Sequence, residues 1–268
     1  MKRVLVIGDN CTDVFVYGKV NRLCPDVPAP VFSPTRTITD SGMAGNVVRN
    51  FKSLGLDADF MCNETEMTKI RYVDEQTNHT FLRVDEGDTA EPFGSSPEVI
   101  NFNFEPGEWD AIVISDYCKG FVTEELIQFC CENNPNVFID TKKVLGDFCK
   151  KAKIIKINEP EYNDLKGKIK EEDWEEKLIV TLGKNGCRWK GAVYLADQVE
   201  VFDLCGAGDS FLAALVFHYL ETGCIMESIF FANDMASQVV QKRGVVACFS
   251  RTNEEGVEDL VKKINAWN

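Results

Sequence analysis

The segment Gly206–Gly208, followed by Asp209, combines residue types that suit chemistry on a charged group. These small residues directly precede an apolar pattern over 211–219 whose spacing predicts a helix. Unpaired backbone amides, including that of Ala207, and the positive end of the helix dipole would converge on an anion beside Asp209. A carboxylate there could accept a hydroxyl proton while the amides stabilise a transferring phosphoryl group. The alternative is an ordinary glycine-rich turn with Asp209 at a helix start.

Two common phosphate-binding loops are excluded by the sequence. No G-x-x-x-x-G-K-[ST] string occurs anywhere in the chain. The apolar run Val4–Ile7 leads into Gly8 and Asp9, but no G-x-G-x-x-G follows it. Phosphate binding must therefore use another architecture.

The elements that position these residues alternate between short apolar strands and longer helical patterns. The predicted strands are 3–7, 111–115, 137–140, 154–157 and 178–182. Apolar residues at helical spacing predict a helix over 44–54 that Gly55 ends, and Gly223 ends the helix after Asp209. This alternation favours an α/β fold with a mostly parallel sheet covered on both faces.

Two segments interrupt this alternation, at about 14–40 and 69–85. Both show period-two alternation, and the first is rich in proline, so we expect antiparallel strands outside the main sheet. They would form a small β-flap over one face of the domain. The acidic run Lys170–Lys177 is interpreted as a solvated helix face, and Thr252–Glu255 has capping-box spacing before a final helix.

Composition limits the class of protein. The chain has 268 residues, 44% hydrophobic and 27% charged, with a formal net charge of −14. Such an acidic chain is a poor binder of nucleic acid or anionic membranes, and its apolar runs fall far short of the roughly 18 residues that a membrane span needs. Eleven cysteines without a C-x-x-C pair, and only two histidines, argue against a zinc site or a disulfide scaffold. We expect a soluble, cytoplasmic protein.

Three motifs in order resemble the ribokinase-like (PfkB) sugar kinases. Asp203–Ser210 resembles their C-terminal signature, Gly8–Asp13 their first strand and sugar-binding aspartate, and Ser41–Val47 their glycine-rich sugar-binding turn. The resemblance covers essentially the whole chain. It implies one kinase domain over residues 1–268, a three-layer α/β/α sandwich whose β-flap is a lid over the sugar.

Four further strings are similar to the heptose-7-phosphate kinases, which form one half of bifunctional heptose kinase/adenylyltransferases. They are Arg22–Val31, Leu82–Asp85, Ser115–Gly120 and Asp140–Lys142. This resemblance implies ATP-dependent phosphorylation of the anomeric hydroxyl of a heptose 7-phosphate. Because no adenylyltransferase half follows Asn268, we expect the kinase step alone. A ribose, fructose or nucleoside kinase, and a catalytically silent sugar-binding homologue, stay open as alternatives.

The resemblance also implies residue roles. Asp209 would be the base and the Gly206–Gly208 amides would bind the transferring group. The sugar would be held by Asp13, Gly42, Asn46 and Lys119, and the nucleotide by Asn158, Glu161, Thr181, Gly183, Gly186 and Asn233. Glu161 would organise Mg²⁺ through its water shell. A requirement for a monovalent cation such as K⁺ stays open.

Two residues depart from the family's usual pattern, and other residues suggest how the chain binds a phosphate and a second copy of itself. Cys205 stands where the family usually has threonine, and Met43 replaces the second glycine of the sugar turn. The basic residues that could pair with a substrate phosphate are Lys119, Lys142, Arg22, Arg71 and Arg83, although surface exposure is the commoner fate of each one. Exposed strand edges in the lid favour a homodimer through 14–40 and 69–85.

Overall fold

The computed structural model describes residues 2–94, 105–202 and 204–241. Its central sheet has the strand order β12-β11-β10-β9-β8-β7-β1-β4. The six strands from β10 to β4 are parallel, and the antiparallel β11 and β12 complete one edge. The bounds are β1 Val4–Gly8, β4 Ala58–Cys62, β7 Ala111–Asp116, β8 Val137–Thr141, β9 Ile154–Asn158, β10 Leu178–Thr181, β11 Cys187–Trp189 and β12 Ala192–Tyr194. The five predicted strands are confirmed to within one residue at each end.

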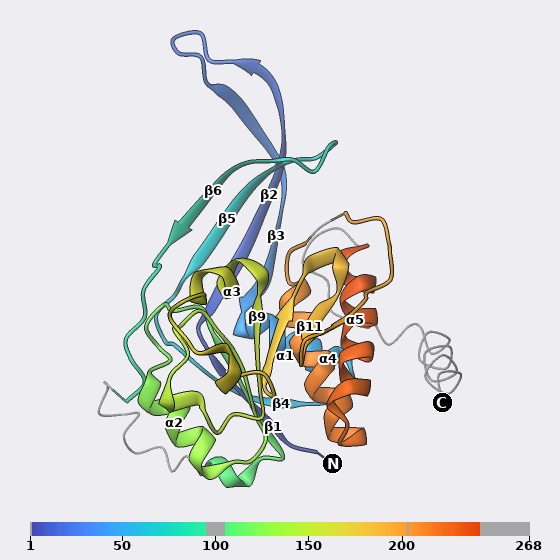
Figure 1. Cartoon of the computed structure of the whole chain (residues 1–268). Coiled ribbons are helices and arrows are strands. Elements are labelled where there is room, and N and C mark those ends of the chain that lie inside the picture. Colours follow the sequence, from blue (N-terminus) through green and yellow to red (C-terminus); the bar gives the residue numbers. More distant parts are fainter. Residues whose placement is uncertain (1, 95–104, 203, 242–268) are drawn as a thin grey trace.

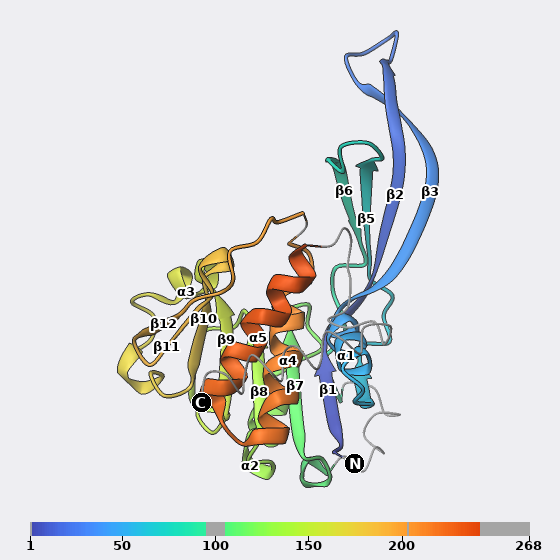
Figure 2. The same cartoon turned by 90° about the vertical axis from the view of Figure 1, so that its right-hand side faces the viewer.

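Helices cover both faces of this sheet, as Figures 1 and 2 show. Alternate residues of β1 explain this, because Val4 and Val6 enter one hydrophobic core while Leu5 and Ile7 enter the other. The first core is closed by α1 (Ala44–Ser53), α4 (Ala207–Thr222) and α5 (Ile225–Val240), and the second by α2 (Glu124–Asn133) and α3 (Glu159–Leu165). Short 3₁₀ turns lie at Pro106–Glu108, Asp147–Cys149, Glu171–Asp173 and Gly183–Asn185. The three-layer α/β/α architecture is confirmed.

Glycines mark both ends of α4. Gly206 precedes it with φ 78° and Gly223 follows it with φ 72°, a left-handed conformation that few other residues adopt easily. The amide of Gly223 donates to the carbonyl of Tyr219, which satisfies one of the last carbonyls of the helix. The helix therefore starts and stops where the sequence predicts.

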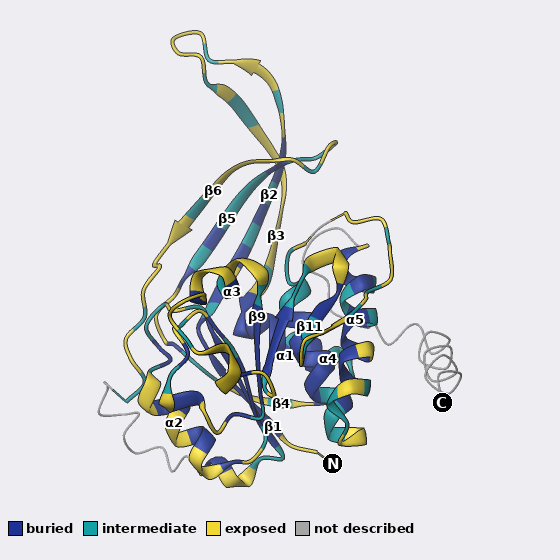
Figure 3. Cartoon of the chain, in the orientation of Figure 1, coloured by how far each residue is buried: buried dark blue, intermediate teal, exposed yellow. Residues whose placement is uncertain are grey.

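A second sheet of four strands forms the lid. Its strands are β2 (Asn10–Leu23), β3 (Pro30–Met43), β5 (Thr68–Asp74) and β6 (Thr80–Glu86), in the order β3-β2-β5-β6. Figure 2 shows it rising away from the helices and the main sheet, and Figure 3 shows that much of it is exposed. The pairings of β2 with β3 and β5 with β6 are antiparallel as expected, but β2 and β5 are parallel. The chain passes through α1 and β4 between β3 and β5, and such a crossover permits parallel pairing.

Other predictions have mixed outcomes. The run Lys170–Lys177 is not a helix: only the 3₁₀ turn Glu171–Asp173 forms, because Trp174 turns inward and is 3% exposed. The capping box at Thr252–Glu255 lies outside the described residues. Every cysteine within the described ranges is free. None of the described helices is long and apolar enough to cross a membrane.

Candidate active site

Polar side chains gather where the parallel strands of the main sheet end. Ser115 of β7 pairs in register with Asp140 of β8, which pairs with Lys156 of β9. At the ends of the next pair, Asn158 of β9 lies beside Thr181 of β10. The carboxyl edge of an open parallel sheet is where ligands of α/β proteins generally bind.

Asp209 is buried at this edge, in the first turn of α4, with 6% of its surface exposed. Its Oδ2 accepts a hydrogen bond from Asn46 Nδ2 at 2.8 Å, and its Oδ1 accepts one from the Tyr117 hydroxyl at 2.9 Å. Burial raises the pKa of Asp209 to about 6, although Asn46, Lys156 and Tyr117 each favour its charged form. A carboxylate with a pKa in this range can accept a proton near neutral pH.

The predicted sugar turn faces Asp209. Asn46 lies in the first turn of α1, and Gly42 lies at the end of β3 opposite Cys11 of β2. A Cβ on Gly42 would overlap Asp13 Oδ2 and lie 2.7 Å from Cys11 Sγ. Asp13 is 7% exposed and is held by an ion pair with Arg71 of β5. The structure therefore places Gly42 against Asp13, with Asn46 four residues further along at the start of α1, and the role of these three residues in sugar binding stays a prediction.

Met43, which stands where a glycine was expected, is strained. It precedes α1 with φ 51° and is 4% exposed, packed in a small core with Cys11 and Met67. A bulky residue at positive φ is unfavourable by about 1–3 kcal/mol. The surrounding apolar contacts with Cys11 and Met67 hold Met43 in this conformation.

Lys156 is a site residue that the sequence analysis missed. It is 4% exposed on β9, and its Nζ lies 2.6 Å from Asp140 Oδ2. Burial opposes its charge, but Asp140, Asp209 and Glu161 outweigh that effect and raise its pKa. A Cβ on Gly208 would lie 2.9 Å from its Nζ, so the ammonium directly adjoins the glycine turn. The sequence feature that could have identified Lys156 is that it is a lysine within an otherwise apolar predicted strand.

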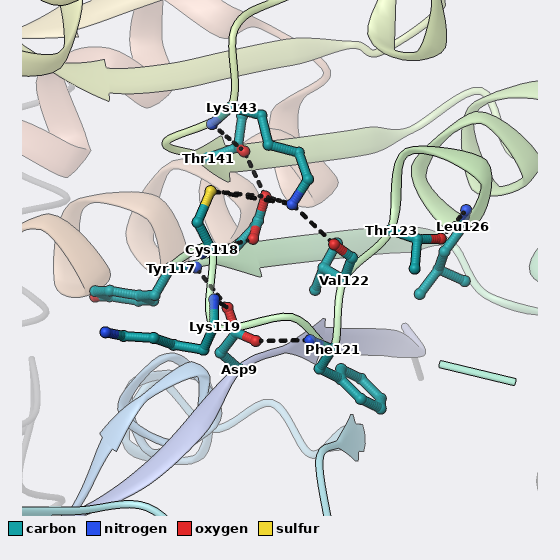
Figure 4. Close-up of polar contacts among 11 residues, drawn as sticks. Asp9, Tyr117, Cys118, Lys119, Phe121, Val122, Thr123, Leu126, Thr141 and Lys143 are labelled. Carbon is teal, nitrogen blue, oxygen red and sulfur yellow. Dashed lines mark hydrogen bonds and ion pairs between the residues drawn. The ribbon is translucent and has the colours of Figure 1, made fainter. Parts of the chain in front are cut away.

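The loop after β7 carries Tyr117 and is held by a buried aspartate. Asp9, which is fully buried, accepts hydrogen bonds from the backbone amides of Tyr117, Lys119 and Phe121 at 2.8, 3.1 and 3.3 Å. Figure 4 shows these bonds, and shows the side chains of Tyr117 and Lys119 extending to the same side of the loop. Asp9 thus fixes the backbone from which Tyr117 reaches Asp209.

A second buried carboxylate anchors the start of this loop. Asp116 accepts hydrogen bonds from Thr141 Oγ1 at 2.6 Å and from Lys143 Nζ at 2.7 Å. Lys143 also donates to the carbonyl of Val122 at 2.8 Å. These contacts tie the ends of β7 and β8 to the segment that leads into α2. Charged hydrogen bonds of this kind are shorter and stronger than neutral ones.

The predicted nucleotide residues lie along β9, β10 and α5. Asn158 and Glu161 form a capping box at the start of α3, each side chain accepting from the other residue's backbone amide at 2.8 Å. Thr181 donates to the carbonyl of Ile157, and Gly183 and Gly186 take the left-handed φ values 58° and 84°. Asn233, 5% exposed on α5, donates to the carbonyl of Tyr194 at 3.0 Å. The side chains of Asn158 and Glu161 therefore also have a structural explanation in the helix start.

Lys119 lies apart from this nucleotide row. Its side chain forms an ion pair with Asp88, at the lower end of the lid after β6. Tyr117, two residues earlier, is half-buried, and its pKa is raised well above its usual value, first by desolvation and then by Asp209. It therefore stays protonated and donates to Asp209. In the sequence, Tyr117 is one residue of the string Ser115–Gly120, and nothing local to that string indicates a role for its hydroxyl.

These residues fit a nucleotide with a divalent cation. Three carboxylates, from Asp140, Asp209 and Glu161, lie close enough to Lys156 to affect its pKa, and oxygen ligands are those that Mg²⁺ prefers. Among the described residues, no group of three or more His, Cys, Asp and Glu could hold a metal by itself. Mg²⁺ commonly keeps several waters and binds substrate phosphates together with one or two protein carboxylates.

The family follows from comparison with known proteins. The family model of the pfkB family carbohydrate kinases matches residues 42–253. The chain belongs to this family. It is therefore a carbohydrate kinase, a phosphotransferase whose family uses ATP with Mg²⁺. The match includes the sugar turn from Gly42 onward, the segment around Asn158 and the turn before Asp209.

Curated relatives of this pfkB kinase carry the name bifunctional protein HldE. The one from Caulobacter sp. strain K31 is 30% identical over 297 residues, covering 90% of this chain and 60% of that protein. The one from Campylobacter jejuni subsp. doylei is 28% identical over 309 residues, covering 98% and 67%. The chain spans about three fifths of the length of the curated relatives that it matches first.

Solved structures agree on the fold. Thermotoga maritima ribokinase superposes with a TM-score of 0.71 at 16% identity, covering 98% of this chain and 100% of that one. Escherichia coli phosphofructokinase-2 in complex with potassium gives 0.70 at 15% identity, covering 100% and 99%. The ribokinase-like fold is thereby confirmed for this pfkB kinase.

Proposed function

We propose that this chain transfers the γ-phosphoryl group of ATP to the anomeric hydroxyl of D-glycero-D-manno-heptose 7-phosphate, giving the 1,7-bisphosphate. The HldE relatives, at 27–30% identity over nine tenths of the chain, support a heptose substrate. The four strings similar to heptose-7-phosphate kinases belong to the same similarity, and one of them, Ser115–Gly120, forms the loop from which Tyr117 donates to Asp209.

The observation that carries the chemistry is the placement of Asp209. Its carboxylate lies in the first turn of α4, beside the Gly206–Gly208 turn and within hydrogen-bond distance of Asn46 from the sugar turn. A hydroxyl held by Asn46 and Asp13 would lie between the carboxylate and an anion at the helix start. Asp209 accepts the hydroxyl proton while the hydroxyl oxygen bonds to the γ-phosphorus. The bond from that phosphorus to the bridging oxygen breaks, and ADP leaves.

The negative charge of the transferring group is met by fixed donors. The amides of Gly206, Ala207 and Gly208 stand at the positive end of α4, and the Lys156 ammonium lies under Gly208. Because Lys156 is buried and held by Asp140, it needs little reorganisation to act on a phosphate. The helix-start amides and the Lys156 ammonium together explain how a chain of net charge −14 can bind two phosphorylated substrates.

We propose that Asn158, Thr181, Gly183, Gly186 and Asn233 bind ATP along β9, β10 and α5. Glu161 would hold Mg²⁺ through its water shell, and the ion would neutralise phosphate charge. Whether the reaction also requires a monovalent cation such as K⁺ is tested by measuring the activity with and without that cation. ATP as co-substrate implies a cytoplasmic reaction.

The lid would pair two chains in a homodimer. The outer strands β3 and β6 have unpaired edges within the described lid, and Leu23, Phe81 and Leu82 are 62%, 42% and 55% exposed. Light scattering at working concentration tests this, since a monomeric mass would contradict it.

The substrate is tested by ADP release from purified protein with ATP and a panel of sugars. The panel holds the heptose 7-phosphate, ribose, fructose, their 5- and 6-phosphates and a nucleoside. We expect the highest kcat/KM with the heptose 7-phosphate. A higher value with ribose or fructose would favour the runner-up kinases, and sugar binding without ADP release would favour a silent homologue, for which the strained Met43 is the structural argument.

A further inference from the structure

Lys69 is a buried cation that the proposed reaction has not yet used. It lies on β5 at the lower end of the lid and is 9% exposed. Its Nζ lies 5.4 Å from the ring centre of Tyr117. Across the three described ranges, no carboxylate oxygen lies within 4.0 Å of this Nζ. A buried ammonium without a paired anion is rare, because its desolvation is unfavourable.

Its neighbours are also cationic, but each of them has a carboxylate. Arg71 pairs with Asp13, Arg83 with Asp85 and Lys119 with Asp88. Arg71 and Arg83 stand directly opposite each other on β5 and β6, an arrangement that is unfavourable for like charges. Three of these four cations are therefore each matched by a carboxylate, and Lys69 is the one that has no contacting carboxylate among the described residues.

Burial lowers the pKa of Lys69, and the charges of Arg83 and Lys119 lower it further, while Cys11 and Asp13 oppose this. The largest of these effects is burial, which no contacting carboxylate of the described residues offsets. A bound anion would reverse this effect, because an opposite charge at short range favours the ammonium form.

This cluster lies close to the proposed base. The Tyr117 ring separates Lys69 from Asp209, since the ring lies beside the Lys69 ammonium and its hydroxyl donates to Asp209. Asp13, a proposed sugar ligand, pairs in register with Lys69 across β2 and β5. A sugar whose reacting hydroxyl is at Asp209 would thus extend past Asp13 toward Lys69.

We propose that Lys69, supported by Arg83 and Lys119, binds the phosphate that the sugar substrate already carries. This rests on the proposed function and deepens it, because it selects phosphomonoesters of sugars over free sugars. The dianion would supply the missing partner of Lys69 and would bridge the main domain, through Lys119, to the lid strands β5 and β6. Charge-assisted bonds to phosphate are the strong ones among hydrogen bonds.

The test compares binding of heptose 7-phosphate and of the unphosphorylated heptose by calorimetry, without ATP, in wild type and Lys69→Met. Wild type should bind the phosphorylated sugar at least about tenfold more tightly, and Lys69→Met should weaken that binding about 10- to 100-fold while leaving the free heptose unchanged. Lys19→Gln is the matched control, because Lys19 is 46% exposed on the outer lid and pairs with Glu75. It should change neither affinity.

Equal weakening of both sugars by Lys69→Met, or no weakening, would overturn the proposal, as would a wild type that binds both sugars equally. If circular dichroism shows that Lys69→Met does not fold, Arg83→Gln serves as the test variant, because Arg83 is 46% exposed and its replacement disturbs the fold less. The proposal then requires that Arg83→Gln lower the preference for the phosphorylated sugar over the free sugar. Measurement of ADP release distinguishes a failure of the proposed kinase function from a failure of the proposed phosphate site. Phosphate-dependent binding through Lys69 without ADP release would refute the kinase assignment alone, and unchanged turnover of heptose 7-phosphate in Lys69→Met would refute the phosphate site alone.

Discussion

The side-chain amide of Asn46 donates a 2.8 Å hydrogen bond to the carboxylate of Asp209, across 163 positions of sequence. The first turns of α1 and α4 therefore meet at one point of the sheet edge. α1 brings the glycine-rich sugar turn and α4 brings the turn for an anion. This contact is the structural basis for expecting a sugar hydroxyl and a phosphoryl group at the same carboxylate.

The pKa of Asp209, raised to about 6 by burial, predicts the acid limb of the activity profile. Below that pH the carboxyl is protonated and cannot accept the hydroxyl proton, so kcat/KM should fall about tenfold per pH unit.

The contribution of Asp209 to the free energy of unfolding should change in the opposite direction and fall as the pH rises. Because the folded pKa is raised, the contribution of Asp209 to stability is largest near pH 4 and is lost as the pH rises through about 6. Initial rates and thermal unfolding from pH 4.5 to 8.5 measure both.

Tyr117→Phe should move this acid limb upward by about one pH unit and lower kcat about tenfold, because the hydroxyl stabilises the charged form of Asp209. A substrate phosphate also titrates near pH 6, but it does so equally in both proteins. Tyr219→Phe, at the other end of α4, is the control and should leave the profile in place. An unshifted limb in Tyr117→Phe would show that this hydroxyl does not set the protonation of the base.

Much of the fold could be predicted from residue pattern. The buried parallel strands are short apolar runs, and Gly55 and Gly223 end the helices that precede them. The parallel pairing of β2 with β5 could not be predicted, because alternation of polar and apolar residues indicates a strand but not the strand with which it pairs. The acidic run at 170–177 shows a similar limit: its charges indicate a surface, while the inward turn of Trp174 depends on the core beneath it.

The site was only partly predictable for a related reason. Glycine turns and helix starts are local, so the residues around Asp209 and Asn46 can be recognised in sequence. Lys69 lies in a strand of alternating polar and apolar residues and Lys156 in an otherwise apolar strand, and lysines usually face solvent. Their burial follows from contacts with Asp140 and Tyr117, which are distant in sequence. Tyr117 likewise gains its role only when the loop held by Asp9 meets α4.

Gly42→Ala should damage sugar binding selectively. A Cβ there overlaps Asp13 and crowds Cys11, so the Asp13 carboxylate must move. A displacement of about 1 Å in a substrate-positioning group can reduce the rate about 100-fold, so we expect a loss of that size in kcat/KM for the sugar with an unchanged KM for ATP. Gly107→Ala, where the nearest atom would lie at an ordinary 3.7 Å, is the control. Equal losses for both substrates would contradict a sugar-specific role.

Lys156→Met should destabilise the protein by about 3–5 kcal/mol, because it leaves the Asp140 carboxylate buried without its cation. Adding Asp140→Asn should restore much of the stability, but the KM for ATP should stay raised in both variants. Denaturant unfolding and ATP titrations measure the two effects, with Lys151→Met, 67% exposed, as control. A normal KM for ATP in the double variant would leave Lys156 with a structural role only.

The central claim is that Asp209 is the base of a sugar kinase, and the most direct measurement is ADP release by Asp209→Asn with heptose 7-phosphate and ATP. Asp147→Asn, whose side chain is 92% exposed, is the matched control. We predict that Asp209→Asn folds, with an unfolding temperature near that of wild type, binds both substrates and loses activity by about 100- to 10,000-fold. The control should keep full activity. A folded Asp209→Asn variant that releases ADP at the wild-type rate would contradict the account.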